Sequence, residues 1–367
     1  MGGELMDWIK GYSASYYMTI VDPSSWRDLR IVDITGGSIN KTDTSLMESA
    51  QVELTENLGE AWVRIYLDAK QANGGGRTAL FTGLLQTPST QWNGRIDSYS
   101  AECYSVLKAA DDVILQRGWY ALAGQNGVAI AARLLDATPA PVEVADDPPL
   151  LSTSIVAEDG ETALTMAQKL VQASGWRMKI TGDGTIRLCA PADLPAAILD
   201  TQTNDIVELS ITDQQDLYSC PNVYLASSGD RTYTARDEES IERRGREIWA
   251  VEYNVALNAG ESIMSYAIRK LEESKAAARQ VHYSRRYLPD VTPGDIVQLR
   301  FPAQSIFGDY KITKQGISLG YAATVSEDCV ETYRIESPEI VQTEFFLMTD
   351  GNDYLATDGN DYMIGVG

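Results

Sequence analysis

The sequence predicts an α+β protein made mostly of β-strands, in which two β-barrel-like portions flank a small α+β module. Apolar and polar residues alternate in 50–55 and in 249–257, a period of two that is typical of half-buried strands. Between them, apolar residues recur at helical spacing in 128–135 and 161–174. The predicted parts are an N-terminal β-barrel-like domain (1–105), an α+β module (106–204), a second β-barrel-like domain with a helical insertion (205–340) and a C-terminal tail (341–367).

Short strands separated by glycine turns make up the N-terminal portion. Residues 62–67 alternate between the two faces of a strand, and a further strand is predicted at 78–85. Gly36-Gly37 and 73–76 break the chain between strands. This pattern is typical of a β-barrel or a β-sandwich.

The middle section combines helices with a hairpin. Gly175 is placed to end the helix predicted at 161–174, and Thr181-Gly182-Asp183-Gly184 joins two short strands as a hairpin turn. Repeated prolines in 139–149 predict a loop without regular structure, because proline lacks an N–H donor and restricts its predecessor.

Strands return from residue 205, and one helix, predicted at 261–281, interrupts them. Pro293-Gly294-Asp295 predicts a turn into a strand at 296–301, and a further strand is predicted at 310–314. We expect these strands to form the second β-barrel-like unit.

The C-terminal tail holds the only clear internal repeat that the sequence indicates. Residues 349–354 (TDGNDY) recur unchanged as 357–362. The repeat lacks the length and closing glutamate of an EF-hand loop and the glycine spacing of a β-roll, so short strands joined by tight turns are favoured. Its aspartates remain weak calcium candidates: Asp350, Asp353, Asp358 and Asp361.

The charge balance excludes several functions. With 52 acidic and 30 basic residues, the chain carries a net charge of −22. Such a charge opposes binding to nucleic acid phosphates and to anionic membranes. No stretch approaches the roughly 18 consecutive apolar residues of a membrane span. Asp7 and Lys10 interrupt the start of the chain where an export signal needs an apolar core. The four cysteines form no CxxC, so we expect reduced core residues and folding in a cytosol.

The sequence predicts no enzyme. It lacks the HExxH, GxSxG, P-loop and GxGxxG signatures. Its single histidine, His282, stands in an arginine-rich segment, where a surface or interface role is favoured over that of a catalytic base. Among so many acids, carboxylate pairs such as Asp111 and Asp112 arise by chance and do not indicate glycoside hydrolysis. We therefore expect no catalytic residue and no cofactor, and no metal ion apart from the weak calcium candidates.

Two arginine clusters are the candidate interface residues. Arg243, Arg244 and Arg246 form the first, and Arg285 and Arg286 form the second. A nucleic-acid patch is the alternative. In so acidic a chain, pairing with carboxylates is favoured, either within the subunit or across a subunit boundary.

Three stretches resemble the hub proteins of bacteriophage tails, a family that includes baseplate hub proteins, late control D proteins and prophage tail proteins. The first runs from Leu150-Leu151-Ser152 through Gly175-Trp176 into Gly182-Asp183-Gly184. The second is Gly118-Trp119-Tyr120 with the helix after it. The third runs from Ile241-Glu242-Arg243-Arg244-Gly245 to Pro293-Gly294-Asp295. Together they cover most of residues 100–315, and none is a catalytic signature.

This resemblance implies a homotrimeric ring in the virion, at the tail tip or baseplate, assembled in the cytoplasm of a bacterial host. The ring would adapt the sixfold tail tube, or a distal tail protein, to a threefold central spike or fibre, beside other baseplate proteins. DNA would be passing cargo during ejection, and carboxylates in the channel would repel it. The chain itself would bind no membrane.

Two other functions are compatible with the sequence. A receptor- or carbohydrate-binding tail-tip module is suggested by 19 tyrosines, 7 tryptophans and the aromatic terminal repeat, because aromatic rings stack on sugars. A tail-associated wall hydrolase comes third, since hydrolase domains usually lie beyond the hub.

Overall fold

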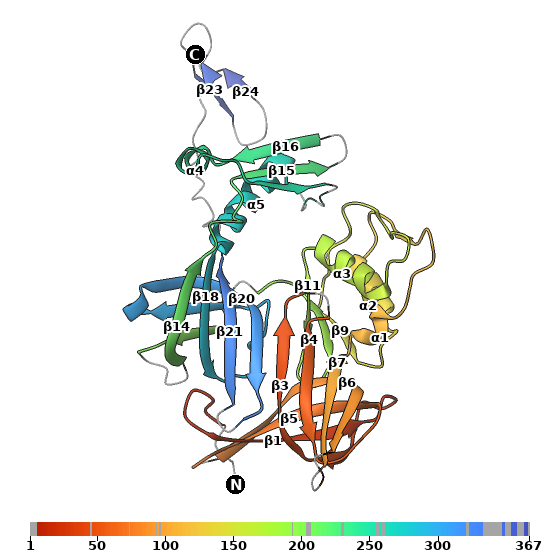
Figure 1. The fold of residues 1–367 in the computed structure, drawn as a ribbon. Helices are drawn as coiled ribbons and strands as arrows, with labels where there is room; N and C mark the ends of the chain where they lie inside the picture. Colours follow the sequence, from red (N-terminus) through yellow and green to blue (C-terminus); the bar gives the residue numbers. More distant parts are fainter. Residues whose placement is uncertain are drawn as a thin grey trace. The chain divides into compact units, whose positions relative to one another are not determined.

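The fold was determined as a computed structural model (Figure 1). It describes residues 6–332 except 45, 73, 93, 95–96, 193, 203–206, 229–230, 254, 256, 258–260 and 321–322, together with the strands at 347–348, 354–357 and 363–365. Residue contacts divide the chain into two units, 1–332 and 333–367, and each is described by itself.

The N-terminal strands form consecutive antiparallel pairs. Their order in the sheet is β3-β4-β7-β6-β5-β1-β2. The hydrophobic residues of their core include Ile39, Val52, Ile65 and Phe81. The strands are β1 (Ser13–Val21), β2 (Asp28–Val32), β3 (Ile34–Thr42), β4 (Glu48–Leu54), β5 (Ala61–Gln71), β6 (Gly74–Trp92) and β7 (Asp97–Ser105).

A second group of strands continues the same sheet. The order β14-β18-β21-β20 joins β3 through antiparallel β20–β3 pairing, from Lys314 opposite Thr42 to Ser318 opposite Ser38. β19 pairs with β20, and β13 pairs with β19. The strands are β13 (Ala197–Asp200), β14 (Val207–Gln215), β18 (Arg279–Arg286), β19 (Ile296–Phe301), β20 (Ile306–Ser318) and β21 (Thr324–Glu331).

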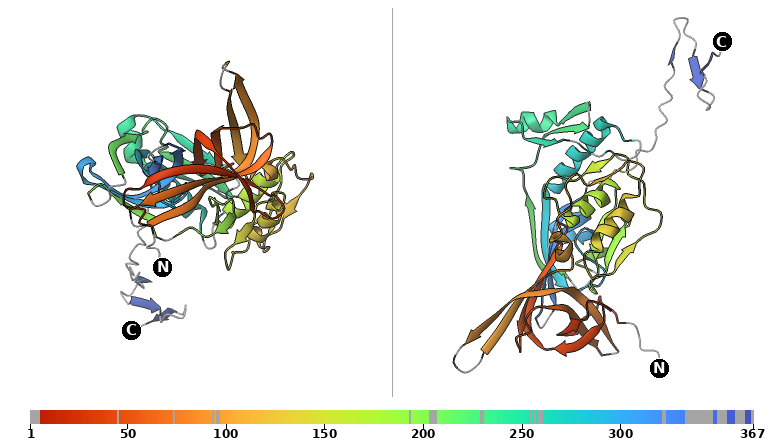
Figure 2. Two further views of the ribbon diagram at one scale, coloured as in Figure 1. Left: turned by 90° about the horizontal axis from the view of Figure 1, so that it is seen from below. Right: turned by 90° about the vertical axis from the view of Figure 1, so that its right-hand side faces the viewer.

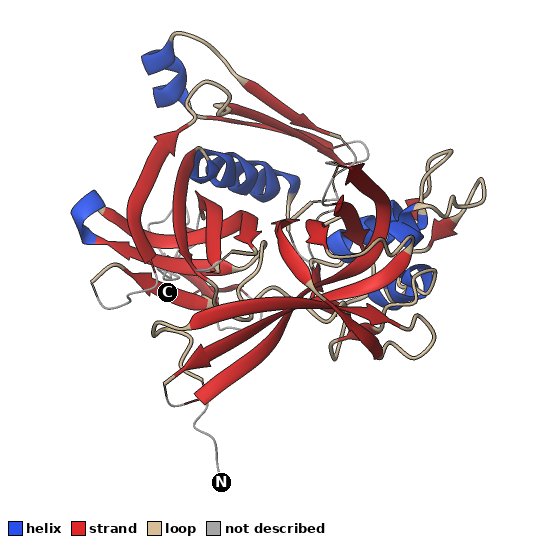
Figure 3. Ribbon diagram, turned by 60° about the horizontal axis from the view of Figure 1, so that its bottom comes forward, coloured by secondary structure: helices blue, strands red, loops and turns tan. Residues whose placement is uncertain are grey.

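Strands therefore predominate, as Figure 3 shows, and the predicted mostly-β, α+β fold is confirmed. The two strand-rich portions share one 13-stranded sheet rather than standing apart. Within the described strands, the main path runs from β14 to β2 without closing on itself by strand pairing. β4 shows why the prediction worked, because its residues alternate strictly between buried and exposed.

The middle section is an α+β module in which α2 and α3 pack side by side (Figures 1 and 2). Asn126 caps α2 by accepting from the Ala129 N–H, and Thr162 caps α3 by accepting from the Thr165 N–H. The elements are α1 (Lys108–Asp111), β8 (Tyr120–Ala121), α2 (Gly127–Leu135), β9 (Val142–Val144), β10 (Ile155–Val156), α3 (Ala163–Ala173), β11 (Arg177–Ile180) and β12 (Ile186–Cys189).

The prediction for 139–149 was wrong in part. Val142–Val144 forms the short strand β9, which pairs in parallel with β12. The prolines flank this strand and do not interrupt it, so its N–H groups remain free to pair.

The module contains a second internal repeat that sequence reasoning missed. Gly124 and Gly160 both have positive φ, +80° and +85°, ahead of the helix caps Asn126 and Thr162. In each case the cap residue follows the glycine by the same number of positions, Asn126 after Gly124 and Thr162 after Gly160. The module therefore consists of two β-α-β units, β8-α2-β9 and β10-α3-β11, whose first strands pair with each other.

A small α/β insertion lies between β14 and β18. Its sheet has the order β16-β15-β17, and α5 packs on β15 and β16. The helix predicted at 261–281 is shorter, because the chain from Arg279 alternates and pairs with β14 and β21. The elements are β15 (Val223–Ser228), β16 (Arg231–Arg236), α4 (Glu238–Arg244), β17 (Trp249–Glu252) and α5 (Ile263–Ala277).

The described residues of the C-terminal unit form the short antiparallel strands β22 (Leu347–Met348), β23 (Tyr354–Thr357) and β24 (Met363–Gly365). Their presence agrees with the short strands predicted for this tail. The calcium candidates Asp350, Asp353, Asp358 and Asp361 lie outside the described residues.

Candidate functional site

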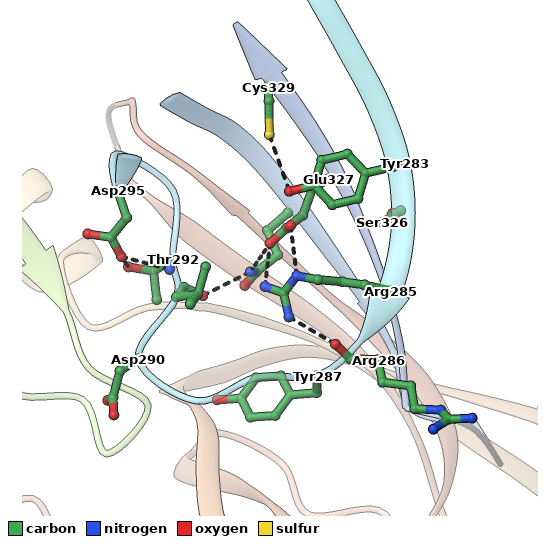
Figure 4. A network of polar contacts seen from close by, with 12 residues as sticks. Tyr283, Arg285, Arg286, Tyr287, Asp290, Thr292, Asp295, Ser326, Glu327 and Cys329 are labelled. Atoms are coloured by element: carbon green, nitrogen blue, oxygen red, sulfur yellow. Dashed lines mark hydrogen bonds and ion pairs between the residues drawn. The ribbon is translucent and has the colours of Figure 1, made fainter. Parts of the chain in front are cut away.

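A buried polar network lies beside the place where β20 and β3 join the two strand-rich portions (Figure 4). Arg285 on β18 and Glu327 on β21 are both fully buried. The Arg285 Nε donates to Glu327 Oε2 at 2.8 Å, and its Nη2 donates to Glu327 Oε1 at 2.6 Å. The third nitrogen, Nη1, donates to the Arg286 carbonyl at 2.9 Å. The guanidinium therefore binds the carboxylate through two parallel hydrogen bonds, the strongest geometry for such a pair.

Gln315 connects this ion pair to the following loop. Its Nε2 donates to Glu327 Oε1 at 2.8 Å and to the Val291 carbonyl at 3.0 Å. Burial opposes the charge of Arg285, but the charge and hydrogen bonds of Glu327 outweigh burial and raise the pKa of Arg285. Arg285 therefore stays ionised in the interior, where two hydrogen bonds join it to Glu327.

The cysteines near this sheet are chemically inert. Cys329 lies 3.6 Å from the Tyr283 hydroxyl, and burial raises its pKa. Burial also raises the pKa of Cys103 to about 12. Both thiols therefore stay protonated at neutral pH, so neither supplies a thiolate nucleophile.

The loop after β18 is held by the α+β module. Arg177 on β11 donates to the Gly294 carbonyl at 2.7 Å and forms an ion pair with Asp295. Lys179, on the same strand, pairs with the other Asp295 oxygen at 3.0 Å and donates to the Asp290 carbonyl at 3.2 Å. The Pro293-Gly294-Asp295 turn thus links the module to the second group of strands.

The other end of the same loop is held by the N-terminal strands. The Tyr12 hydroxyl donates to the Tyr287 carbonyl at 3.0 Å. Close to the turn, Lys311 on β20 pairs with Asp43, the residue after β3, at 2.7 Å. The loop therefore contacts all three parts of the unit.

We expect Asp295→Asn to lower the free energy of unfolding by about 2 kcal/mol at pH 7, because hydrogen bonds between charged groups contribute roughly that much. Burial raises the pKa of Asp295, but Arg177 and Lys179 outweigh burial and hold the pKa below 3.8. The stabilisation is therefore present above pH 3.8 and disappears as the pH falls through the pKa that Asp295 has in the folded protein. Urea denaturation at several pH values should show the variant and the wild type converging in acid.

Asp290→Asn is the matched control, because the Asp290 side chain is exposed and only its carbonyl accepts from Lys179. Asparagine also tolerates the positive φ of 65° at this position. An equal loss of stability in both variants would contradict the assignment.

The hairpin turn 181–184 connects the module to the N-terminal strands. Thr82 on β6 donates to the Gly182 carbonyl at 2.8 Å. Arg64 on β5 and the Trp26 indole donate to the Asp183 carbonyl at 3.0 and 2.9 Å. A Cβ on Gly182 would lie 1.8 Å from the Ala79 carbonyl oxygen. Only glycine allows the two backbones to approach this closely.

A cavity of about 620 Å³ lies where the module meets the Pro293-Gly294-Asp295 turn. Its lining includes Trp176 and Met178 from the module, Pro293 from the turn, and Asp43 and Lys311 beside the β3–β20 contact. Among the described residues, no group of three or more histidine, cysteine, aspartate or glutamate side chains could hold a metal ion. The arrangement fixes the relative positions of three structural parts, and its charged groups are engaged with one another.

The structure places the two arginine clusters differently. Arg285 is completely buried and pairs with Glu327 of the same chain, which is the alternative of pairing within the subunit. Alternation with Val281 and Tyr283, both buried on β18, is the sequence signal that could have placed it inside. Arg286 is partly exposed and lies near Gly11.

The first cluster is at the surface. Arg243 lies 3.8 Å from Glu239 within α4, whereas Arg244 and Arg246 donate to backbone carbonyls of residues 217–220. His282 is exposed on β18, and its Nδ1 lies 2.6 Å from Asp328. Within the described chain, no helix is long and apolar enough to cross a membrane.

Solved tail proteins share this architecture. The tail protein from Neisseria meningitidis MC58 is 14% identical, with a TM-score of 0.65 over 88% of this chain and 97% of that one. The 43 kDa tail protein of prophage MuSo2 from Shewanella oneidensis is 13% identical, with a TM-score of 0.64 over 87% and 98%. Prophage tail protein gp18 from Listeria monocytogenes EGD-e is 11% identical, with a TM-score of 0.53 over 86% and 94%.

The likeness lies in the structure, because no protein-family model matches the sequence and the search of curated proteins found no match. The similarity covers most of this chain and most of each of the three tail proteins. The resemblance expected from the local motifs is thereby confirmed for the fold. The protein has the fold of phage tail proteins.

Proposed function

We propose that this protein is a structural component of a phage tail tip, where three copies form a ring that joins the tail tube to a central spike or fibre. The observation that carries the proposal is the single sheet made by both strand-rich portions through β3 and β20. A chain that places two such portions edge to edge supplies two successive segments of a ring wall. Three copies would therefore supply six segments, which matches a sixfold tube.

One face of this shared sheet is polar across the β3–β20 junction. The opposite face is buried and carries the core residues Ile39, Val52 and Ile317. The polar face consists mainly of hydroxyl, amide and glycine positions that neighbour one another in the register: Ser38, Asn40, Ser49, Gln51, Ser284, Gly316, Ser318 and Ser326.

This face suits a channel wall past which DNA moves. Binding to DNA comes mainly from lysine and arginine contacts with phosphates. On the four central strands, from β4 to β21, the cations of this face are Lys311 and Lys314, and the carboxylates are Glu53, Asp309 and Asp328. The wall would thus be close to neutral there, rather than lined by carboxylates as the overall charge suggested. A neutral hydroxyl surface neither grips nor strongly repels a duplex.

The proposed role is structural and not enzymatic. It rests on a junction in which Arg177, Lys179 and Arg285 pair with carboxylates or carbonyls of neighbouring strands and loops. These contacts hold neighbouring strands and loops in place, which a structural ring requires.

The purified chain is expected to form a trimer, with three times its 40.2 kDa mass in light scattering. Sedimentation velocity at micromolar concentration should show the same single species, and electron microscopy should show a ring with an opening on a threefold axis. The proposal would be refuted if the purified chain were a monodisperse monomer and remained a monomer when isolated tail tubes were added.

A further inference from the structure

The loop that follows β14 is held rigidly by its own side chains. Asp216 Oδ1 accepts from the N–H groups of Tyr218 and Ser219 at 3.1 and 3.2 Å, and Oδ2 accepts from the Ser219 hydroxyl. The hydrogen bond from Ser219 is the main cause that lowers the pKa of Asp216, so these contacts persist well below neutral pH.

Two arginines of the first cluster fix the same loop from the other side. Arg244 Nη1 donates to the Leu217 carbonyl at 3.1 Å and to the Cys220 carbonyl at 2.9 Å. Arg246 Nη2 donates to the Tyr218 carbonyl at 3.1 Å, and its guanidinium lies 5.1 Å from the centre of the Tyr218 ring. These arginines are therefore positioning residues for the loop.

The loop presents two apolar side chains to solvent. Leu217 is 53% exposed and Tyr218 is 80% exposed. A rigid, exposed tyrosine stacked on an arginine has the composition of a protein-binding hot spot. It is also ordered in advance, so binding would cost little additional side-chain entropy.

The location indicates which partner would cover this loop. β14 is the terminal strand of the shared sheet, and among the described residues it pairs only with β18, so its other edge is open. In a ring built from this sheet, that edge faces the next copy. Arg243 and Arg246 are exposed beside this loop, among the acidic residues of α4.

We propose that Leu217 and Tyr218 dock on a neighbouring copy of this chain and hold the ring together, an inference that rests on the proposed function. The contact is head-to-tail, because the loop of one copy meets a different, carboxylate-bearing surface of the next. Arg243 and Arg246 would pair with carboxylates at the rim of this contact, and these pairs would offset part of the repulsion between acidic subunits.

Tyr218→Ala tests the docking directly. Loss of a hot-spot side chain should weaken subunit association by roughly 30-fold, the equivalent of about 2 kcal/mol. Sedimentation velocity over a dilution series measures this shift, and circular dichroism with thermal unfolding checks that the variant is folded. Leu217→Ser should act in the same direction.

Tyr120→Ala is the matched control, because Tyr120 is 60% exposed on the α+β module. The control should associate like the wild type. A trimeric wild type with an equally stable Tyr218→Ala trimer would overturn this inference and leave the proposed ring intact. A wild type that is monomeric even on isolated tail tubes would refute the ring itself. Equal weakening by Tyr120→Ala would also overturn the inference, because the effect would not be specific to the loop.

Discussion

Replacing Arg285 with methionine is expected to lower the free energy of unfolding by about 3–5 kcal/mol, because it leaves a buried carboxylate without its partner. Glu327 is fully buried and would lose both hydrogen bonds from the guanidinium, retaining those from Gln315 and Tyr283. The carboxylate would then have to ionise in an apolar interior or take up a proton. Urea denaturation followed by tryptophan fluorescence, at fixed protein concentration, measures the change.

Two further variants separate this effect from a general one. Arg286→Met removes the neighbouring, partly exposed arginine and should change stability by less than about 1 kcal/mol. The double variant Arg285→Met/Glu327→Leu removes both charges and should recover much of the loss, because apolar pairs often replace buried ion pairs without penalty. A double variant as unstable as the single one would show that the network contributes more than charge neutralisation.

Substituting alanine for Gly182 should destabilise the protein by about 3 kcal/mol and release the module from β6. The added Cβ would lie 1.8 Å from the Ala79 carbonyl oxygen, a contact that neither backbone can relieve locally. The hairpin would have to move away and break the hydrogen bond from Thr82. Calorimetry should show a lower unfolding temperature, and limited proteolysis should show faster cleavage within 106–190.

Gly320→Ala is a suitable comparison, because its new Cβ would meet nothing closer than the Ser318 hydroxyl at 3.4 Å. Its unfolding temperature should match that of the wild type. If Gly182→Ala behaved in the same way, the hairpin would not be the contact that holds the module.

Much of the fold could be predicted because local patterns determine local structure. The alternation in 50–55 lies in β4, and the pattern in 161–174 corresponds to α3, which ends before Gly175 with φ of +66°. The Gly182-Asp183 and Gly294-Asp295 turns were also recognisable as turns. Their role as contacts between parts was not, since it depends on Thr82 and Arg177, which are distant in sequence.

Pairing between distant strands explains what the sequence could not show. The partner of Arg285 could not be named from the sequence, because Glu327 comes within reach only after β18 pairs with β21, where it lies opposite Tyr283. The repeat in the module was missed because it is carried by cap positions, Asn126 and Thr162, and not by identical residues. Side chains that differ can make the same capping hydrogen bond, so a search for repeated letters overlooks them.

The β3–β20 ladder also has a consequence for synthesis on the ribosome. β3 ends at Thr42, but its partner β20 begins only at Ile306, so most of the chain must emerge before the ladder can form. Until then β3 exposes an unpaired edge, which another nascent copy could occupy. We therefore expect polypeptides truncated before β20 to aggregate, and we expect chaperones that shield nascent strands to increase the yield of the intact chain.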